Sequence, residues 1–241
     1  MTENLIKPRD LDWHPQPYAQ NYRSTHLRAP AHARLHYAPT CTEMTGPTFG
    51  HGMLGEHDDD LIVNYAAAGQ SAIGPRIIVH GTLRDEDGRP VPNKLIEVWQ
   101  ANAGGRYRHK KDGYTAPLDV NFGGCGRCIT GEDGSYSFRT ILPGAYPWPN
   151  GGNDWRPAHI HFSVFGDGFA QRVITQMYFE GDPHIALCPI VQSIPDAAAI
   201  DRLVARLDMA KTIPMDIRAY RFDIVLRGRS ATPFENAMEG T

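Results

Sequence analysis

Two histidines separated by one residue are the side chains in this sequence whose spacing points most directly to chemistry. His159 and His161 lie in the run from Trp155 to His161, which we expect to form a β-strand. Because successive side chains of a strand point to opposite faces, residues i and i+2 share a face, and two such imidazoles can bind one metal ion. For so short a motif, a half-buried histidine pair without a metal is the simpler alternative.

Two tyrosines are further candidates, because each lies in a loop that leaves an expected strand. Tyr107 follows Gly104-Gly105-Arg106, and Tyr146 follows Pro143-Gly144-Ala145. A free phenol has a pKa of about 10 and is ordinarily a core or surface group. A ferric ion stabilises the phenolate, and tyrosinate is a known ligand of haem iron. Two phenolates and two imidazoles would neutralise much of the charge of iron(III).

The composition is that of an ordinary globular protein and narrows the classes of partner. The chain has 241 residues, of which 41% are hydrophobic and 21% charged, enough for one all-β domain with a full core. A formal net charge of -3, without blocks of like charge, predicts no nucleic-acid partner. No apolar run reaches membrane-spanning length, and residues 1–13 are too polar for a signal peptide, so we expect no membrane partner and a cytoplasmic location.

The cysteines predict no disulfide framework. Cys125 and Cys128 have C-x-x-C spacing, but no second pair is present, and we expect this motif in a glycine-rich loop rather than at the start of a helix. With Cys41 and Cys188 they are expected to be reduced thiols without a redox or zinc role.

Short strands separated by turn signals predict an all-β fold. Residues 1–74 are rich in proline and lack periodicity, which predicts an extended N-terminal arm that packs on another surface. Residues 75–241 predict a β-sandwich domain with long loops. The expected strands are 76–83, 95–100, 135–140, 158–165, 172–179 and 220–226.

One late helix is expected to begin near Asp196. Ile200, Leu203, Val204 and Leu207 follow the spacing i, i+3, i+4, i+7, which places them on one helical face. We expect this helix to pack on the outside of a sheet.

Three core segments, 91–98, 130–138 and 142–146, resemble the transthyretin-like or prealbumin-like sandwich repeat. By itself this pattern implies only a structural or ligand-binding module without a metal, because a fold does not determine a function.

The segments around the candidate donors resemble the intradiol ring-cleavage dioxygenases, and the likeness covers nearly the whole chain. The segments that carry it are Arg9–Pro15, Asn121–Gly124, Pro147-Trp148, Asn153–His159, Tyr178–Pro183 and Tyr220–Gly228.

The resemblance implies one non-haem Fe(3+) per chain, bound by Tyr107, Tyr146, His159 and His161 with a solvent hydroxide as fifth ligand. In the family pattern Tyr146 and His159 are axial, and Tyr107 and His161 are equatorial. A catechol loses its protons to the hydroxide and to Tyr146, which leaves the metal, and the iron makes the bound ring reactive toward O2. Arg156 is implied to stabilise the negative charge that develops on the ring.

The resemblance also implies a substrate site and a partner. Tyr22, Trp148, Gln176 and Ile190 match positions that line the substrate or oxygen site, with Tyr22 near a substrate carboxylate. The likeness is strongest to members that cleave protocatechuate in the β-ketoadipate pathway. In these members an iron-carrying β chain pairs with a homologous α chain, which implies αβ pairs in a larger assembly. The resemblance thus implies that the arm of residues 1–74 packs on the partner subunit and that residues 75–241 form the catalytic domain.

Three alternatives remain open from the residues. An intradiol dioxygenase of catechol or hydroxyquinol would share the four ligands. A zinc enzyme would use His159 and His161 with a distant third histidine, such as His51 or His80. The third alternative is a transthyretin-like binding module without a metal.

Overall fold

A computed structural model describes residues 19–23, 51–166 and 172–233, and strands dominate these ranges. The expectation of an all-β chain is therefore confirmed, whereas the specific transthyretin-like sandwich stays a prediction. The strands are β1 (Arg76–Arg84), β2 (Leu95–Gln100), β3 (Cys125–Ile129), β4 (Ser135–Ile141), β5 (Tyr146–Pro147), β6 (Trp155–Arg156), β7 (His159–Phe165), β8 (Arg172–Phe179), β9 (Val204–Leu207), β10 (Arg218–Arg221) and β11 (Ile224–Val225).

Helical segments are short in the described part of the chain. They are the α-helix α2 (Ala197–Asp201) and the 3-10 turns η2 (His51–Met53), η3 (Ile185–Leu187) and η4 (Val191–Ser193). No helix in these ranges is long and apolar enough to cross a bilayer.

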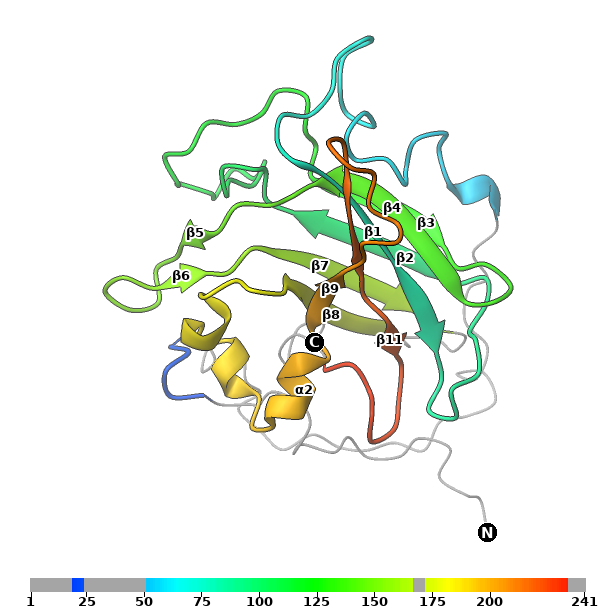
Figure 1. The fold of residues 1–241 in the computed structure, drawn as a ribbon. Coiled ribbons are helices and arrows are strands. Elements are labelled where there is room, and N and C mark those ends of the chain that lie inside the picture. Colours follow the sequence, from blue (N-terminus) through cyan, green and yellow to red (C-terminus); the bar gives the residue numbers. More distant parts are fainter. Residues whose placement is uncertain (1–18, 24–50, 167–171, 234–241) are drawn as a thin grey trace.

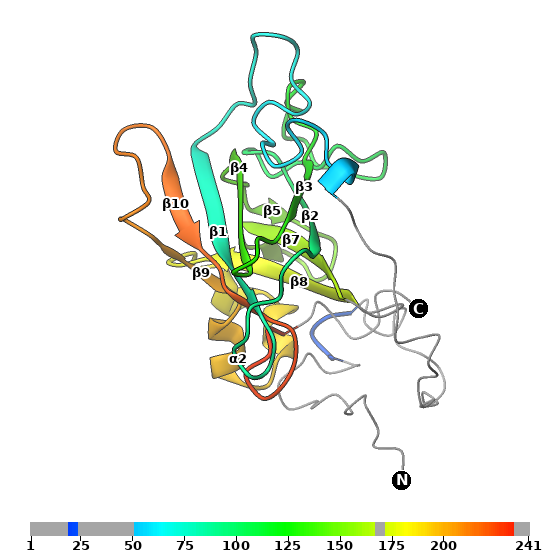
Figure 2. The ribbon, with the colours of Figure 1, turned by 90° about the vertical axis from the view of Figure 1, so that its right-hand side faces the viewer.

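Nine of the described strands form one strongly curved sheet, and β5 and β6 form a separate two-stranded sheet. Across the curved sheet β4 pairs with β1, and β1 is followed by β10, β9, β8, β7, β2 and β3. β11 continues the parallel pairing of β10 along β1. Figures 1 and 2 show that the layer of β1 and β4 lies across the layer of β2, β7 and β8. The two ends of the sheet, β3 and β4, therefore come near each other, and the sheet is nearly closed.

Residues 58–61 fill the gap between β3 and β4. The Asp58 carbonyl accepts a hydrogen bond from the Arg127 amide at 2.7 Å, and the Asp59 carbonyl accepts one from the Arg139 amide at 2.8 Å. Leu61 is fully buried in the core, beside the bare Cα of Gly126, where a Cβ would lie 2.3 Å from the Leu61 Cδ1. Part of the range expected to be an arm thus packs on its own chain, while its contact with a partner subunit stays a prediction.

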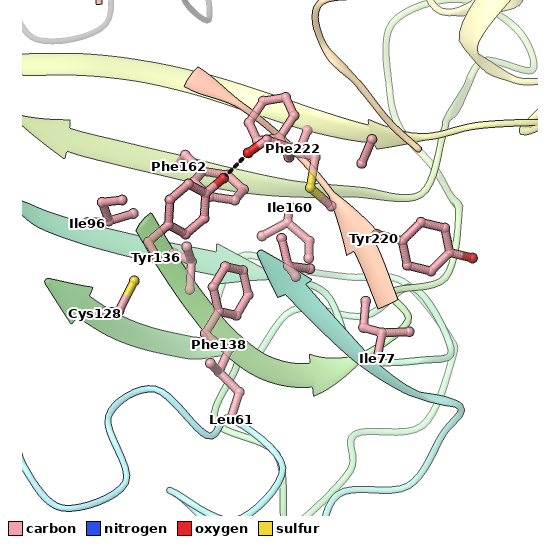
Figure 3. Packing of buried hydrophobic residues seen from close by; sticks show 14 of the residues in the cluster. Leu61, Ile77, Ile96, Cys128, Tyr136, Phe138, Ile160, Phe162, Tyr220 and Phe222 are labelled. Carbon is pink, nitrogen blue, oxygen red and sulfur yellow. Dashed lines mark hydrogen bonds between the residues drawn. The ribbon is translucent and has the colours of Figure 1, made fainter. Parts of the chain in front are cut away.

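The core lies between the two layers of the curved sheet. The Phe162 ring packs on Phe138 and Phe222, with ring centroids 5.8 and 5.2 Å away. Figure 3 shows these rings among the buried hydrophobic side chains. The Tyr136 hydroxyl donates to the Phe222 carbonyl at 2.5 Å, which satisfies both polar groups inside the core. Ile160 lies on the same face of β7 as Phe162 and is fully buried. The opposite face of β7 therefore carries His159 and His161.

Most expected strands lie where the sequence placed them. β2 and β8 coincide with the expected ranges, and β1, β4 and β7 differ by one residue at one end. The expected strand 220–226 is instead divided between β10 and β11, with a break after Arg221. At the break the Phe222 carbonyl oxygen lies against the Cα of Gly81, where a Cβ would be only 1.8 Å from that oxygen. Cys125–Ile129 was wrongly expected to be a glycine-rich loop; it forms strand β3, since it pairs with β2 and residues 58–61 cover its other edge.

The late helix begins as expected but is shorter. The Asp196 side chain caps it by accepting from the Ala198 amide, yet the helix ends at Asp201. Val204 and Leu207, which were expected on the helix, lie in strand β9 instead. The Tyr178 amide donates to the Leu203 carbonyl at 2.7 Å, so pairing with β8 outweighs the helical spacing of the sequence.

Replacing Leu61 by Ala tests whether residues 58–61 belong to this core. The substitution removes a fully buried side chain, so we expect a loss of about 3 kcal/mol in the free energy of unfolding, measured by denaturant titration. Leu187→Ala is the matched control, because Leu187 is 73% exposed and its loss is expected to cost less than about 0.5 kcal/mol. Equal effects of the two substitutions would contradict this closure of the sheet.

Candidate functional site

Two phenol oxygens and two imidazole nitrogens meet beside strand β7. The Tyr107 Oη lies 3.4 Å from His159 Nε2 and 3.2 Å from His161 Nε2. The Tyr146 Oη lies 3.5 Å from His159 Nε2. The four donors predicted from the sequence are therefore together, although they come from one strand, one hairpin and one loop.

The spacing of these donors is the spacing of atoms that share an ion. Two ligands about 2.1 Å from one metal, at angles of about 90° to 110°, lie about 3.0 to 3.4 Å apart. The separations of 3.2 and 3.4 Å fall within this range, and the separation of 3.5 Å lies just above it. The donor set of two phenols and two imidazoles consequently fits a transition-metal ion.

His159 is held in the form that can bind a metal. Its Nδ1 lies 2.7 Å from the Pro157 carbonyl, which only accepts, so Nδ1 carries the proton and the Nε2 lone pair faces the phenols. Burial, followed by the charges of Arg156 and His161, holds the pKa of His159 well below its ordinary value. The ring is therefore neutral near pH 7, as a ligand must be.

The hairpin of β5 and β6 brings Tyr146 opposite Arg156. The two residues are directly paired across the hairpin. The Arg156 side chain is buried; its guanidinium donates to Gln176 Oε1 and lies over the Trp148 ring, 5.7 Å from the ring centre. The Tyr178 hydroxyl donates to the same Gln176 oxygen at 2.9 Å, which fixes the amide. A permanent positive charge is thus fixed next to the donor group.

The remaining predicted pocket residues lie in a second apolar cluster beside this site. Tyr22 is 2% exposed, meets the Trp148 ring edge-on at 5.5 Å, and shares the cluster with Ile190. Figure 1 shows this cluster's segments, the blue residues 19–23 and the yellow turns before α2, on the side of the β5–β6 hairpin. The structure thus brings Tyr22, Trp148 and Ile190 together next to Arg156.

Asn150 attaches residues 19–23 to the loop of Trp148. Its Oδ1 accepts from the Arg23 amide at 2.8 Å, and its Nδ2 donates to the Asn21 carbonyl at 2.8 Å. Because both ends of one amide hold this segment, Tyr22 is fixed against Trp148 by more than apolar contact.

Two buried donors in this region have no hydrogen-bond partner among the described residues. They are the Trp148 Nε1 and the Gln176 Nε2. A buried donor without an acceptor is costly, so two of them around Arg156 favour a site that receives an oxygen-bearing ligand.

Several residues of the site were not found from the sequence. The Trp99 ring stacks on His161, with centroids 4.8 Å apart and an interplanar angle of 4°. The Asp182 carboxylate accepts from the Ala158 amide at 2.9 Å, just before His159. Trp99 lies on β2 directly across from His161, and this pairing is what places it in the site. A single sequence does not show which strands pair, so this contact could not be predicted.

The zinc alternative with His80 finds no support in the site. His80 lies on β1, with its Nε2 3.1 Å from the Asp208 carboxylate and its Nδ1 3.5 Å from Lys211 Nζ. The side chain of His51 lies outside the described residues. Within the described residues, no group of three or more His, Cys, Asp or Glu side chains is placed to hold a metal.

Comparison with known proteins shows the family of this chain. The family described as Dioxygenase matches residues 44–228. The chain is 49% identical over 231 residues to the protocatechuate 3,4-dioxygenase beta chain of Burkholderia cepacia, covering 96% of this chain and 97% of the relative. The chain therefore belongs to the intradiol ring-cleavage dioxygenase family, and the expectation of an oxidoreductase of this class is confirmed.

More distant relatives are named as dioxygenases of another diol, catechol. Catechol 1,2-dioxygenase 1 of Acinetobacter lwoffii is 40% identical over 46% of this chain and 38% of its own length. The solved catechol 1,2-dioxygenase of Acinetobacter sp. ADP1, inhibited by bound mercury, is 28% identical with a TM-score of 0.53, covering 72% of this chain and 59% of that one. This chain thus spans well under two thirds of both catechol enzymes.

The two cysteines of the C-x-x-C motif lie in different environments, which predicts a labelling pattern. Cys128 is buried in the core, where burial and then the charge of Asp59 raise the pKa of its thiol to about 12. Cys125 is exposed as a residue, but partial burial of its thiol and then the charge of Glu97 raise the thiol pKa above its ordinary value. Since only the thiolate reacts, we expect iodoacetamide at pH 8 to label Cys125 slowly and to leave Cys128 and the buried Cys188 unlabelled in the folded protein.

Peptide mass spectrometry measures this pattern, with protein labelled in denaturant as the control in which all cysteines react. Labelling of Cys128 as fast as Cys125, or a disulfide between them after mild oxidation, would contradict the absence of a redox role.

Proposed function

We propose that this chain is the iron-carrying β subunit of a protocatechuate 3,4-dioxygenase. It would cleave protocatechuate with O2 between the two hydroxyl-bearing carbons, giving 3-carboxy-cis,cis-muconate. The observation that carries the proposal is the meeting of Tyr107, Tyr146, His159 and His161 donor atoms at 3.2 to 3.5 Å. Its specificity is supported by 49% identity to a protocatechuate 3,4-dioxygenase beta chain over 96% of this chain.

Tyr107, Tyr146, His159 and His161 are the proposed ligands of one Fe(3+). Two phenolates supply two negative charges, which favour a trivalent ion over a divalent one, and imidazole is a good ligand for iron. When bound, the ferric ion withdraws electron density from both oxygens of a catechol and makes its ring reactive toward O2. The neutral state of His159 and the direction of its Nε2 support this assignment.

Tyr146 is proposed to take a proton from a substrate hydroxyl. Its phenol is half-buried, and the short hairpin of β5 and β6 holds its backbone. A phenolate beside a cation is a base at neutral pH and becomes neutral again when it accepts a proton. Tyr107 lies between both imidazoles, at 3.4 and 3.2 Å, and is proposed to remain a ligand throughout.

Arg156 is proposed to stabilise negative charge on the substrate ring. Its guanidinium is positive at every relevant pH, and its position is set by Gln176 and Trp148. A charge that is already oriented needs no rearrangement when negative charge develops, which is the basis of electrostatic catalysis. The Gln176 and Trp148 donors that lack described partners are proposed to meet substrate or oxygen.

Substrate choice is proposed to depend on the segment of Tyr22. This residue is buried between Trp148 and Ile190, and we assign its hydroxyl to the carboxylate of protocatechuate. A homologous α chain is proposed to complete the pocket and to receive the arm of residues 1–74, since the relative from Burkholderia cepacia is named a beta chain.

The colour of the purified protein tests the metal and its ligands. We expect about one iron per chain and a visible band from tyrosinate-to-iron charge transfer. Tyr107→Phe and Tyr146→Phe should each change this band and lower the turnover number at least tenfold, because each removes a proposed ligand. Tyr65→Phe is the control, since Tyr65 is 52% exposed in another loop. A colourless wild-type protein with zinc would contradict the proposal.

Oxygen uptake tests the substrate and the partner. With a co-expressed α chain, we expect kcat/KM for protocatechuate to exceed that for catechol and hydroxyquinol at least tenfold, because only protocatechuate has the carboxylate. Tyr22→Phe should raise KM for protocatechuate and leave KM for catechol nearly unchanged, so the ratio of the two kcat/KM values should fall. Equal use of the three diols, or an active monomer on gel filtration, would contradict these assignments.

A further inference from the structure

We propose that Asn102 is a positioning residue that holds the two phenol-bearing loops against each other and so sets the separation of the Tyr107 and Tyr146 oxygens. The inference rests on the proposed function, because it concerns how the same metal site is formed. Asn102 lies two residues after β2 and is 5% exposed. It acts through the backbone of both loops.

The Asn102 side chain organises the turn that leads to Tyr107. Its Oδ1 accepts from the Gly104 amide at 2.9 Å and from the Arg106 amide at 3.0 Å. Its Nδ2 donates to the Pro117 carbonyl at 2.9 Å, which ties the turn to the loop that follows Tyr107. The whole amide is therefore used to fix the backbone on both sides of Tyr107.

The Asn102 backbone joins this turn to the loop of Tyr146. Its amide donates to the Arg106 carbonyl at 2.9 Å. Its carbonyl accepts from the Gly105 amide at 2.9 Å and from the Gly144 amide at 3.0 Å. Gly144 lies two residues before Tyr146, so one carbonyl oxygen binds the backbones that carry the two phenols.

The two loops touch at a crossing of glycines, which leaves no room for them to slip. At Gly105 a Cβ would lie 2.4 Å from the Ala145 carbonyl oxygen, and at Gly144 a Cβ would lie 2.5 Å from the Ala103 carbonyl oxygen. Gly105 also has φ +81°, which favours glycine. Because there is no free space between the loops, a movement of the turn at Asn102 also moves the backbone next to Tyr146.

The consequence for the site is geometric. The Tyr107 and Tyr146 rings lie 5.5 Å apart at an angle of 88°, and both oxygens lie within 3.5 Å of one nitrogen, His159 Nε2. A shift of about 1 Å in either loop breaks the agreement with a shared ion, since ligand distances vary by only about 0.2 Å. The turn at Asn102 is thus where the spacing of the phenols is set.

Asn102→Ala and Asn102→Asp test this role in the full chain co-expressed with its α partner. Asn102→Ala removes all three side-chain hydrogen bonds. Asn102→Asp keeps an oxygen for the Gly104 and Arg106 amides but replaces the donor to Pro117 by an oxygen that repels the Pro117 carbonyl. Asn64→Ala is the matched control, because the Asn64 amide also donates to a backbone carbonyl, that of Cys125, away from the phenols.

The measurements are iron release to a chelator, the position of the visible band, kcat and KM, and thermal unfolding of the metal-free protein. For Asn102→Ala we expect at least tenfold faster iron release, a shifted band, and a fall in kcat larger than the change in KM. Asn102→Asp should also shift the band and speed iron release, because its second oxygen repels the Pro117 carbonyl. Asn64→Ala should keep the wild-type band and iron release, even if its unfolding temperature falls by a similar amount.

If Asn102→Ala and Asn64→Ala have the same band and iron release, the role of Asn102 is only structural and the inference is wrong. If the wild-type protein has no tyrosine-dependent band with iron, the proposed function itself fails, which is a different result. Should Asn102→Ala not fold, Gly105→Ala against Gly88→Ala replaces it. Gly88 has φ +79° and no atom within 4 Å of an added Cβ, so only Gly105→Ala is expected to shift the band. Identical bands in this pair would also overturn the inference.

Discussion

Alternate side chains of strand β7 face the apolar core and the candidate site, and the position of every other donor depends on this alternation. Ile160 and Phe162 are fully buried on one face, so the register of β7 is fixed by the free energy of burying them. His159 and His161 must therefore lie on the opposite face of β7. A slip of one residue would place two imidazoles in the apolar core and two large side chains in the site.

Around that strand, the site is assembled from elements that depend on one another. Arg156 lies across the hairpin from Tyr146, and both are held near His159 by pairing and by the Gln176 amide. The buried cation also contributes, after burial itself, to the low pKa of His159. The arrangement that keeps the imidazole neutral therefore also places a positive charge beside the donors.

Local patterns in the sequence predicted the strands and the histidine pair, because alternation and spacing are local properties. The roles of Tyr107 and Tyr146 came from resemblance to a family, and no periodicity connects residues of two distant loops. Val204 and Leu207 were placed on a helix, since their spacing is helical, but pairing with β8 and β10 decides their conformation. The closure by residues 58–61 and the six hydrogen bonds of Asn102 depend on contacts between distant segments, which one sequence does not reveal.

An anomalous difference map at the iron absorption edge, from crystals of the iron-loaded protein, tests whether the four donors share one ion. We expect one peak per chain, within about 2.3 Å of Tyr107 Oη, Tyr146 Oη, His159 Nε2 and His161 Nε2. A peak elsewhere, or a peak bonded to the histidines with both phenol oxygens out of reach, would contradict it.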